Sequence, residues 1–365
     1  MIATRSSLTF LVAASLLLPN AQDGFAQTIK RPELTSAEAR VIGSCLALIR
    51  SCQLPDGSFN MLDEGKAAGD PVWIAPYFVQ HAALALLAAN DVKKNYSDME
   101  RVGKWLDWCV KHQESGGFWN DTTGTIARNE SNGKVDAHDS SAAMFLLVAE
   151  RYRHSGSKLS PQIVAAAKAS LKCIQNVTDT DGLTWAKPDY KVKFLMDNVE
   201  VYAGMASAEQ LFKSTMNTEE AALAGKHLAA MKEPLLAYWE GSEKDRFAWG
   251  LLPSGQFNDG LVHIYPHGLA QLFGVSFIAA EPAPFRETLG AFTPQTRREG
   301  VGAERFLIAA SRLGEAETKA WRLNVVQDAV TFTPQSVYIF RPALVVLSLL
   351  EGADWMPSVV ASAPP

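Results

Sequence analysis

The sequence has few cysteines and no cysteine motif typical of a metal site. Its four cysteines, Cys45, Cys52, Cys109 and Cys173, lie in the first half of the chain. Cys45 and Cys52 are seven residues apart on one predicted helix. That is about 10 Å at roughly 1.5 Å per residue, too far for a disulfide. Because small apolar residues suit tight helix packing, we expect buried thiols, with a Cys52–Cys109 bridge as the alternative.

Long apolar runs and basic stretches are also scarce. Beyond the N-terminus no segment is long and apolar enough to cross a bilayer, and no basic stripe accompanies the net charge of −5 and the pI near 5.9. A nucleophile elbow, a phosphate-cradling glycine loop and a metalloprotease motif are absent from the sequence, which excludes those enzyme classes. We expect a monomer without a nucleic-acid partner, a metal or another cofactor. The 47% hydrophobic and 20% charged residues are typical of a well-packed soluble protein.

The N-terminus carries an apolar run, Leu8–Leu18. Arg5 precedes this run, Pro19 ends it, and Gly24-Phe25-Ala26 supplies small residues before a cleavage point. The pattern is typical of a secretory signal peptide and is too short for a membrane-spanning helix. We therefore expect cleavage after Ala26, removing residues 1–26, and a mature protein that is periplasmic or secreted and not bound to a membrane.

The rest of the chain is dominated by a repeated pair of helices. Apolar residues recur at helical spacing, and alternating runs typical of strands are scarce. Six apolar helices each open with a cluster of carboxylates, aromatics, His or Arg, and a more amphipathic stretch lies between consecutive openings. The openings are Asp70-Pro71-Val72-Trp73, Asp136-Ala137-His138-Asp139, Asp197-Asn198-Val199-Glu200, Asn258-Asp259-Gly260, Arg298-Glu299-Gly300 and Gln335-Ser336-Val337-Tyr338.

This repetition predicts an outer and an inner series of helices. The outer series is Ser36–Cys52, Ser97–His112, Ser160–Gln175, Thr218–Tyr238, Ala283–Phe292 and Ala316–Gln327. The inner series is Val72–Ala89, His138–Tyr152, Asn198–Lys213, Gly260–Ile278, Gly300–Leu313 and Val337–Leu350. Six pairs predict an all-α (α/α)6 toroid in a single domain, 27–355, whose inner helices direct their polar N-termini into one cavity. The Pro-, Ser- and Ala-rich tail, 356–365, is predicted to be flexible.

A short motif follows three of the outer helices. It joins a Gln, a Gly turn and an aromatic residue in Gln53–Phe59, in Gln113–Trp119 and, more loosely, in Gln175–Trp185. Gly permits the reversal, the aromatic ring fills the gap between helices, and Gln satisfies helix-end groups. The copies resemble the Gln-Trp repeats of terpenoid-cyclase toroids and also loops of six-hairpin glycosidases. The resemblance spans most of the mature chain, and it implies the toroid more strongly than any chemistry.

The opening around Asp136 contains the most polar groups. The simple interpretation is that Asp136 caps a helix, since Asp favours that position. The alternative makes Asp139 a carboxylate that contacts substrate, with Asp136 and His138 beside it. The segment resembles the Asp-x-Asp-Asp-Ser/Thr opening of six-hairpin carbohydrate enzymes and class II terpene cyclases. His138 replaces the central Asp that donates the proton in the cyclases, which argues against cyclase chemistry.

The next opening offers two polar pairs on one predicted helix. Asp197 and Glu200 are three residues apart, and Asn198 and Tyr202 are four apart, so each pair shares a face. A capping box formed by Asp197 and Glu200 is the structural alternative. Because Asn198 and Tyr202 interrupt an apolar helix, we predict that these four residues bind the hydroxyl groups of a sugar or act on it.

The later openings add further candidates. Asp259 and His263 are four residues apart on the fourth predicted inner helix, where Asp259 can orient or charge His263. Two ligands make a weak metal site, so none is predicted. Tyr338 and Arg341 share a face of the last inner helix and are predicted to contact substrate. Pro266 is predicted to kink the fourth inner helix.

Aromatic side chains near the openings can stack on sugar rings. Trp73 and Trp119 lie beside polar loops, and we predict that they bind substrate by stacking. Four others are predicted to be structural because aromatics more often fill a core: Tyr77, Phe118, Trp185 and Trp249.

A cavity ringed by acids and aromatics is typical of a carbohydrate-active protein. Glycoside hydrolysis needs one protonated and one ionised carboxyl group on opposite sides of the bond, which different inner helices can provide. We therefore expect a glycoside hydrolase acting on a poly- or oligosaccharide. Its predicted catalytic residues are Asp139 together with Glu200 or Asp259.

Three other functions stay open. A polysaccharide lyase would use Tyr202 or Tyr265 with His263 on a uronic acid, an enzyme of the terpenoid-cyclase kind would need a sealed aromatic cavity, and a glycan-binding protein would keep Trp73 and Trp119 without needing any acid.

Overall fold

The starts of the outer helices follow from local side-chain chemistry. In this computed structural model, which describes residues 33–240, 246–278 and 302–359, helix α1 (Ser36–Ser51) begins with a capping box between Thr35 and Glu38. Helix α3 (Tyr96–His112) begins after Asn95 and α5 (Pro161–Asn176) after Ser160, and both side chains accept a backbone N–H of the first turn. These are the residues that caps prefer, so the sequence located the three helices closely.

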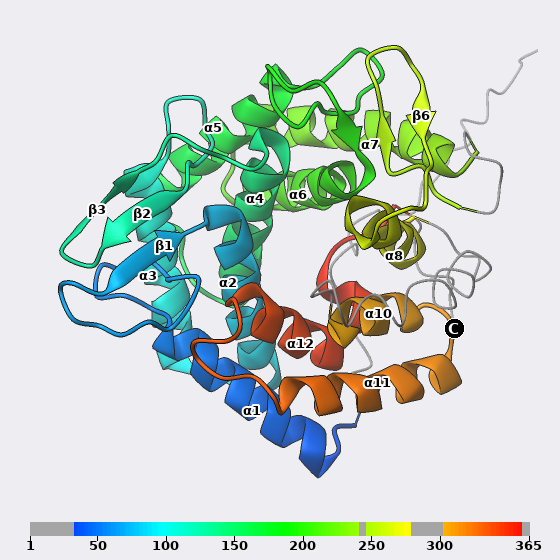
Figure 1. Ribbon diagram of the computed structural model, residues 1–365. Helices are drawn as coiled ribbons and strands as arrows, with labels where there is room; N and C mark the ends of the chain where they lie inside the picture. The colour runs from blue at the N-terminus through cyan, green and yellow to red at the C-terminus, as the bar shows by residue number, and fades with distance from the viewer. Residues whose placement is uncertain (1–32, 241–245, 279–301, 360–365) are drawn as a thin grey trace, which may run out of the picture. The chain divides into compact units, whose positions relative to one another are not determined.

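Six inner helices form a closed ring (Figure 1). Helix α2 packs on α4, α4 on α6, α6 on α8, α8 on α10, α10 on α12, and α12 returns to α2. The inner helices are α2 (Pro76–Val92), α4 (His138–His154), α6 (Leu195–Ser214), α8 (Leu269–Phe277), α10 (Ala303–Ala310) and α12 (Phe340–Leu350). The predicted all-α (α/α)6 toroid is confirmed.

The outer helices cover this ring. Helices α1, α3, α5, α7 (Thr218–Glu240) and α11 (Glu315–Ala329) pack against inner helices, and α1–α11, α3–α5 and α5–α7 also touch one another. The predicted outer helix Ala283–Phe292 and the opening Arg298-Glu299-Gly300 lie outside the described residues. So does the predicted signal peptide. The contacts divide the chain into two units, Met1–Arg31 and Pro32–Pro365, and every residue described here belongs to the second.

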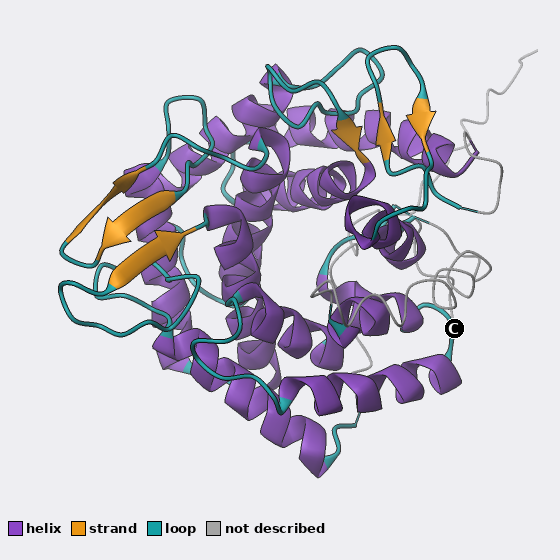
Figure 2. Ribbon diagram, viewed as in Figure 1, coloured by secondary structure: helices purple, strands orange, loops and turns teal. Residues whose placement is uncertain are grey.

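Two small antiparallel sheets were not predicted. One has the order β1 (Pro71–Ile74), β2 (Thr122–Thr125), β3 (Arg128–Ser131), and the other β4 (Lys193–Phe194), β5 (Gly250–Leu251), β6 (Phe257–Asn258). Figure 2 shows them as separate orange groups on the helical ring. Strands of two to four residues are too short to show an alternating pattern, which explains why the sequence missed them.

Two inner helices begin later in the sequence than predicted. Val72 and Trp73 belong to β1, so α2 begins at Pro76 instead of Val72. The fourth inner helix begins with a π-type turn, Ile264–Gly268, and not at Gly260. Strand β4 leads directly into α6 and β1 leads into α2, so both sheets lie near the N-terminal ends of inner helices.

The Gln-Gly turns tie each outer helix to the next. Gly57 and Gly117 have φ of +95° and +86°, and a Cβ on Gly117 would lie 2.1 Å from the carbonyl oxygen of Ala169 in α5. Gln53 donates through its amide to the carbonyls of Gly57 and Arg101, and Gln113 makes the matching bonds to Gly117 and Ala166. Gln therefore bridges the turn and the following outer helix, as a satisfied polar group should.

The third copy differs from its prediction. Its turn pairs Thr178 with Thr184, as Gln53 pairs with Phe59, so Thr178 occupies the Gln position and Gln175 does not. His227 of α7 takes the place of the Gln side chain and ties the turn to the next outer helix, with its Nε2 3.0 Å from the carbonyl oxygen of Gly182. A fourth copy, which the sequence analysis missed, spans 251–257 and has the same backbone bonds around Gly255.

Close helix packing brings two of the polar openings together. Gly204 of α6 packs on Ala143 of α4, where a Cβ on Gly204 would lie 2.6 Å from the Ala143 Cβ. Such an approach between backbones requires glycine. It holds the starts of α4 and α6 side by side.

The cysteines are free and buried, as expected for packing residues. Burial raises the pKa of the Cys45, Cys52 and Cys173 thiols to about 12. The start of the predicted flexible tail is packed instead: Met356 and Val359 are buried, and the Val359 amide donates to the Phe277 carbonyl at 2.8 Å. Among the described helices, none combines the length and the apolar character that crossing a bilayer requires.

Candidate active site

The acidic residues at the starts of α4 and α6 do not cap these helices. The N-cap residues are Ala137 and Phe194, and neither makes a side-chain cap bond. Asp197 is the third residue of α6, and Asp136 precedes the cap of α4. The capping interpretations of Asp136 and of the Asp197–Glu200 pair are therefore wrong, because these carboxyl groups do not bond to the N–H groups of the helix starts.

Four carboxyl groups from these two helix starts form one electrostatic cluster: Asp136, Asp139, Asp197 and Glu200. Desolvation raises the pKa of Asp139 to about 7 and that of Glu200 to about 8, and neighbouring carboxylates add to both effects. Desolvation together with the charges of Asp139 and Glu200 raises the pKa of Asp197 well above its ordinary value. Like charges that share a site cannot all ionise, so the cluster holds protons near neutral pH.

Asp139 has no surface for a substrate. It is fully buried, its Oδ2 accepts the Thr184 hydroxyl at 2.7 Å, and its Oδ1 accepts the Ser140 N–H at 2.8 Å. Asn198 is also fully buried, and its amide donates to the carbonyl oxygens of Thr184 and Phe194. The predicted direct contacts of Asp139 and Asn198 with substrate are therefore wrong, because both side chains are used to hold the protein together.

Asp136 and Asp197 are the open members of the cluster. Asp136 is exposed and Asp197 is half-buried. Within the described part of the chain, neither carboxyl group makes a hydrogen bond or an ion pair. Desolvation raises the pKa of Asp136, and Lys187 opposes that shift. These two carboxyl groups can approach a ligand without first breaking a bond to the protein.

Glu200 connects three helices across the ring. It is fully buried, and Tyr77 of α2 donates its hydroxyl to Oε1 at 2.8 Å. Its Oε2 has no partner among the described residues. The positive charge of Arg305 on α10 lowers the pKa of Glu200, against the larger effect of desolvation. Tyr77 and Arg305 were not predicted as site residues.

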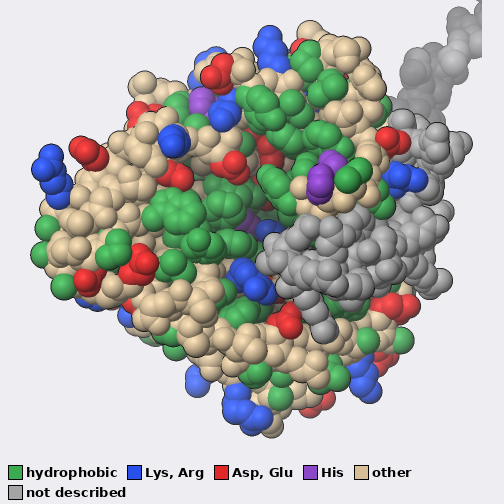
Figure 3. Space-filling model, in the orientation of Figure 1, with side chains coloured by type: hydrophobic (Ala, Val, Ile, Leu, Met, Phe, Trp, Pro, Cys, Tyr) green, Lys and Arg blue, Asp and Glu red, His purple; other side chains and the backbone are tan. Residues whose placement is uncertain are grey.

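The charges converge on one region of the ring. Desolvation raises the pKa of Tyr265, before α8, to about 12, and Asp136, Asp197 and Glu200 all contribute. Figure 3 shows acidic side chains beside a hydrophobic patch in the middle of this face. Carboxyl groups far apart in the sequence therefore act on the same space.

Two predicted aromatic residues meet at the edge of this region. Trp73 of β1 and Tyr338, just before α12, pack edge to face with ring centroids 5.5 Å apart, and Tyr338 is 43% exposed. The Trp73 Nε1–H donates to Asp121 at 3.2 Å. We call Trp73 and Tyr338 the stacking pair.

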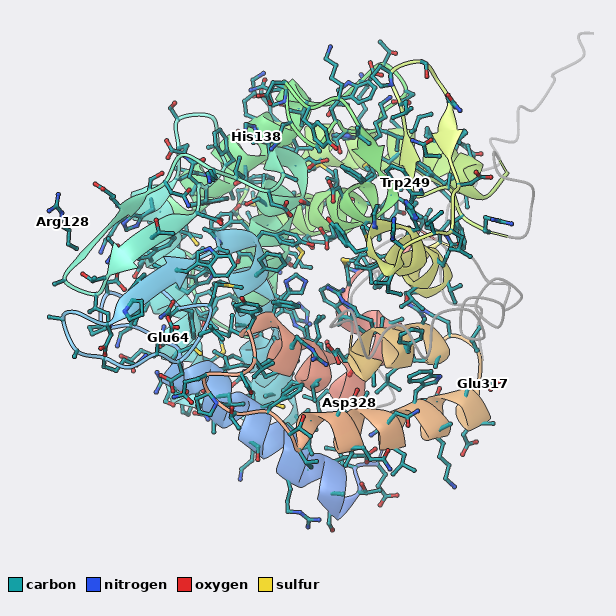
Figure 4. The ribbon with its side chains drawn as sticks, viewed as in Figure 1. Glu64, Arg128, His138, Trp249, Glu317 and Asp328 are labelled. Atoms are coloured by element: carbon teal, nitrogen blue, oxygen red, sulfur yellow. The ribbon has the colours of Figure 1, made fainter. Side chains whose placement is uncertain are left out.

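His138 and Trp249 lie near inner-helix starts (Figure 4), whereas Arg128 lies at the outer edge of the β1–β3 sheet. His138 stacks on Phe118 with ring centroids 3.8 Å apart, and burial lowers its pKa. Trp249 packs against Phe194 and His267.

Trp119 and Arg341 have other partners. Trp119 is 1% exposed, donates its Nε1–H to the Cys109 carbonyl at 2.8 Å and packs on Phe145. Its predicted stacking on substrate is therefore wrong, because the ring fills the core. Arg341 joins α12 to α10 through a bidentate pair with Glu304, with Nε 3.0 Å from Oε1.

Asp259 and His263 do not share a helix face. Residues 259–263 form no helix, so the four-residue spacing carries no geometric meaning there. The His267 Nδ1 accepts the N–H groups of Val262 and His263, both at 3.1 Å, and this bond shapes the segment. Tyr202 is half-buried on α6, where burial raises its pKa.

No protein-family model and no curated protein matches the sequence. Solved structures do match. A glycosidase variant superposes with a TM-score of 0.60 at 10% identity, over 89% of this chain and 100% of that one. A D-mannose isomerase gives 0.53 at 12% identity, over 90% and 96%. An α-1,6-mannanase from a Salegentibacter species gives 0.52 at 12% identity, over 87% and 98%.

The chain shares the (α/α)6 toroid fold of these structures. At these identities the likeness extends to the fold alone. The six-hairpin toroid predicted from the sequence is thereby confirmed, and its chemistry must be argued from the residues described above.

Proposed function

We propose that this six-hairpin toroid is a glycoside hydrolase acting on a poly- or oligosaccharide, with Asp197 as proton donor and Asp136 as general base. One observation supports the pair most directly. Asp136 and Asp197 are the two members of the acid cluster that solvent reaches and that no described protein group engages.

The two roles follow from the environment of each group. Every influence on Asp197 raises its pKa, so it keeps a proton that it can give to the glycosidic oxygen as the carbon–oxygen bond breaks. Burial raises the pKa of Asp136, but Lys187 opposes the shift and Asp136 is the more exposed of the two, so we assign it to take a proton from the water whose oxygen bonds to the anomeric carbon.

The arrangement favours inversion at the anomeric carbon. Axes of packed helices lie about 8–10 Å apart. Asp136 and Asp197 come from the starts of two neighbouring helices, and inversion requires that their carboxyl groups stand about 6.5–9.5 Å apart, with room for a water. NMR of the first product anomer, observed before mutarotation, tests this point.

The other residues support this chemistry without touching the bond. Tyr77 donates a hydrogen bond to Glu200, and the charge of Arg305 lowers the pKa of Glu200. The ring faces of Trp73 and Tyr338, which pack edge to face, can each stack on a sugar ring. The lyase alternative finds no support at Tyr265, since a raised pKa of about 12 makes a tyrosine harder to ionise as a base.

The decisive experiment measures hydrolysis of a panel of α- and β-linked oligosaccharides by wild-type protein, Asp136→Asn and Asp197→Asn. We expect each amide to lower kcat by about 100- to 10,000-fold, the usual contribution of general acid–base groups. Glu209→Gln is the matched control, because Glu209 also lies on α6 but pairs with Lys213 away from the cluster. Full activity in both aspartate variants would refute the assignment. Binding of glycans without hydrolysis by the wild type would make the protein a lectin-like binder.

We also propose that the mature protein is exported as a monomer whose toroid begins after Ala26. Expression of the full chain in a bacterium, followed by N-terminal sequencing of the periplasmic protein, tests the cleavage point. Retention of residues 1–26 would contradict it. Light scattering of the purified protein tests the monomer.

A further inference from the structure

The third Gln-Gly turn differs from its relatives at one buried position. Phe59 in the first copy and Trp119 in the second are buried rings that fill the space under the turn. The equivalent residue of the third copy, by its backbone pairing with Thr178, is Thr184, which is also fully buried. A hydroxyl has replaced an aromatic ring at a site that otherwise serves packing.

The hydroxyl of Thr184 is used by the acid cluster. It donates to Asp139 Oδ2 at 2.7 Å, while Asn198 of α6 accepts the Thr184 N–H at 2.8 Å and donates to its carbonyl. One turn thus joins the first turn of α4 to the first turn of α6. A buried hydroxyl and amide with complete hydrogen bonding fix this geometry.

The buried Asp139 carboxyl group faces titratable groups from four directions. Its negative charge raises the pKa of Asp197 and Glu200 on α6, of Cys173 on α5 and of Tyr238 on α7. In return, Asp136 raises the pKa of Asp139 itself. Asp139 cannot touch a substrate, yet its charge acts on the open carboxyl group of Asp197.

We propose that Asp139, held by the hydroxyl of Thr184, is a positioning residue that keeps the proton on Asp197 while it remains out of reach of the substrate. This inference rests on the proposed function. The turn that elsewhere fills the core is used here to hold a buried, titratable carboxyl group behind Asp136 and Asp197.

The test compares Asp139→Asn, Thr184→Val and Thr184→Ser. Thr178→Val is the matched control, since Thr178 lies in the same turn and its hydroxyl bonds only to the Ile174 carbonyl. Two readouts are used: the pH profile of hydrolysis, and NMR titration of aspartates isotopically labelled at the carboxyl carbon. The second works whether or not a substrate is known, so a failure of the hydrolase assignment stays distinguishable.

Asp139→Asn removes a negative charge, so Asp197 should lose its proton more easily. We expect the alkaline limb of activity and the NMR titration of Asp197 to move down by about one pH unit. Thr184→Val leaves Asp139 without its donor, which keeps Asp139 neutral to higher pH and should move Asp197 in the same direction by less. Thr184→Ser should restore the wild-type titration, and Thr178→Val should not change it.

Two results would overturn the inference. If Asp197 titrates in Asp139→Asn and Thr184→Val as it does in the wild type, and only the melting temperature falls, the hydrogen bond between Thr184 and Asp139 is merely structural. If Asp139→Asn abolishes activity at every pH while Asp197 titrates as in the wild type, Asp139 takes part in the chemistry directly. Should Asp139→Asn fail to fold, Thr184→Val and Thr184→Ser decide alone.

Discussion

Three outer helices begin differently from the inner helices of the ring, whereas the outer helix α11 follows Gly314 without a side-chain cap. Outer helices α1, α3 and α5 start with a Thr, Asn or Ser that caps the first turn. The described inner helices start after Ala75, Ala137, Phe194, Gly268, Gly302 and Ile339, none with a side-chain cap. Caps stabilise a helix locally, whereas uncapped starts leave N–H groups and nearby acids for other uses. The difference separates positions that stabilise the fold from positions that can serve a ligand.

The largest effect should come from the open acids at the inner starts. Asp197→Asn and Asp136→Asn should lower kcat by about 100- to 10,000-fold because each removes a proton-transfer group. Their unfolding free energy should hold or rise, since each relieves repulsion within a cluster of like charges. Parallel kinetics and urea unfolding measure both. If a variant loses both activity and stability, the acids at the inner helix starts stabilise the fold, as the caps of the outer helices do.

Glu200 predicts a pH dependence of stability. Its pKa is about 8 in the folded protein and 4.5 in a free side chain, so the stabilisation it gives is complete below about pH 4.5 and is lost as the pH rises to about 8. Glu200→Gln keeps an acceptor for Tyr77 and removes this dependence. Urea unfolding between about pH 5 and 8 should therefore show a flatter profile for the variant. An unchanged slope would mean that Glu200 is ionised in the fold.

The stacking pair should affect binding more than turnover. Trp73→Ala should raise KM about 2- to 10-fold with kcat nearly unchanged, because an aromatic contact contributes about 0.5–1.5 kcal/mol. Tyr96→Ala is the control, since Tyr96 is an aromatic residue 88% exposed at the start of an outer helix. Equal KM for wild type and Trp73→Ala would remove Trp73 from the site.

The smallest effect on function should come from the outer caps. Thr35→Ala and Ser160→Ala should each cost about 1 kcal/mol of unfolding free energy, because a first-turn N–H loses its acceptor. Activity at temperatures well below melting should not change. A kinetic defect in either variant would show that the outer starts communicate with the site.

The same difference explains what the sequence can and cannot predict. The amphipathic pattern located α1, α3 and α5 to within a residue or two, because this signal is local. Helices α2 and α8 are apolar along most of their length, so their starts have no periodic marker, and both begin several residues later than predicted.

The site follows the same logic. Polar openings on a repeated pattern located acids that interact with one another, Asp136, Asp197 and Glu200, and their roles stay predictions. Which acid is free depends on Thr184, a residue 45 positions after Asp139 that no spacing rule connects to it. Tyr77 and Arg305 were missed because their importance arises only when α2 and α10 face α6.

The contact between α2 and α12 closes the ring with the two ends of the toroid sequence. A ribosome synthesises residues 76–92 first and residues 340–350 last, so one flank of the first hairpin stays uncovered until nearly the whole chain exists. A protein truncated before Phe340 would present that apolar flank to water permanently. Premature termination near the C-terminus should therefore yield an aggregating product and not a smaller working ring.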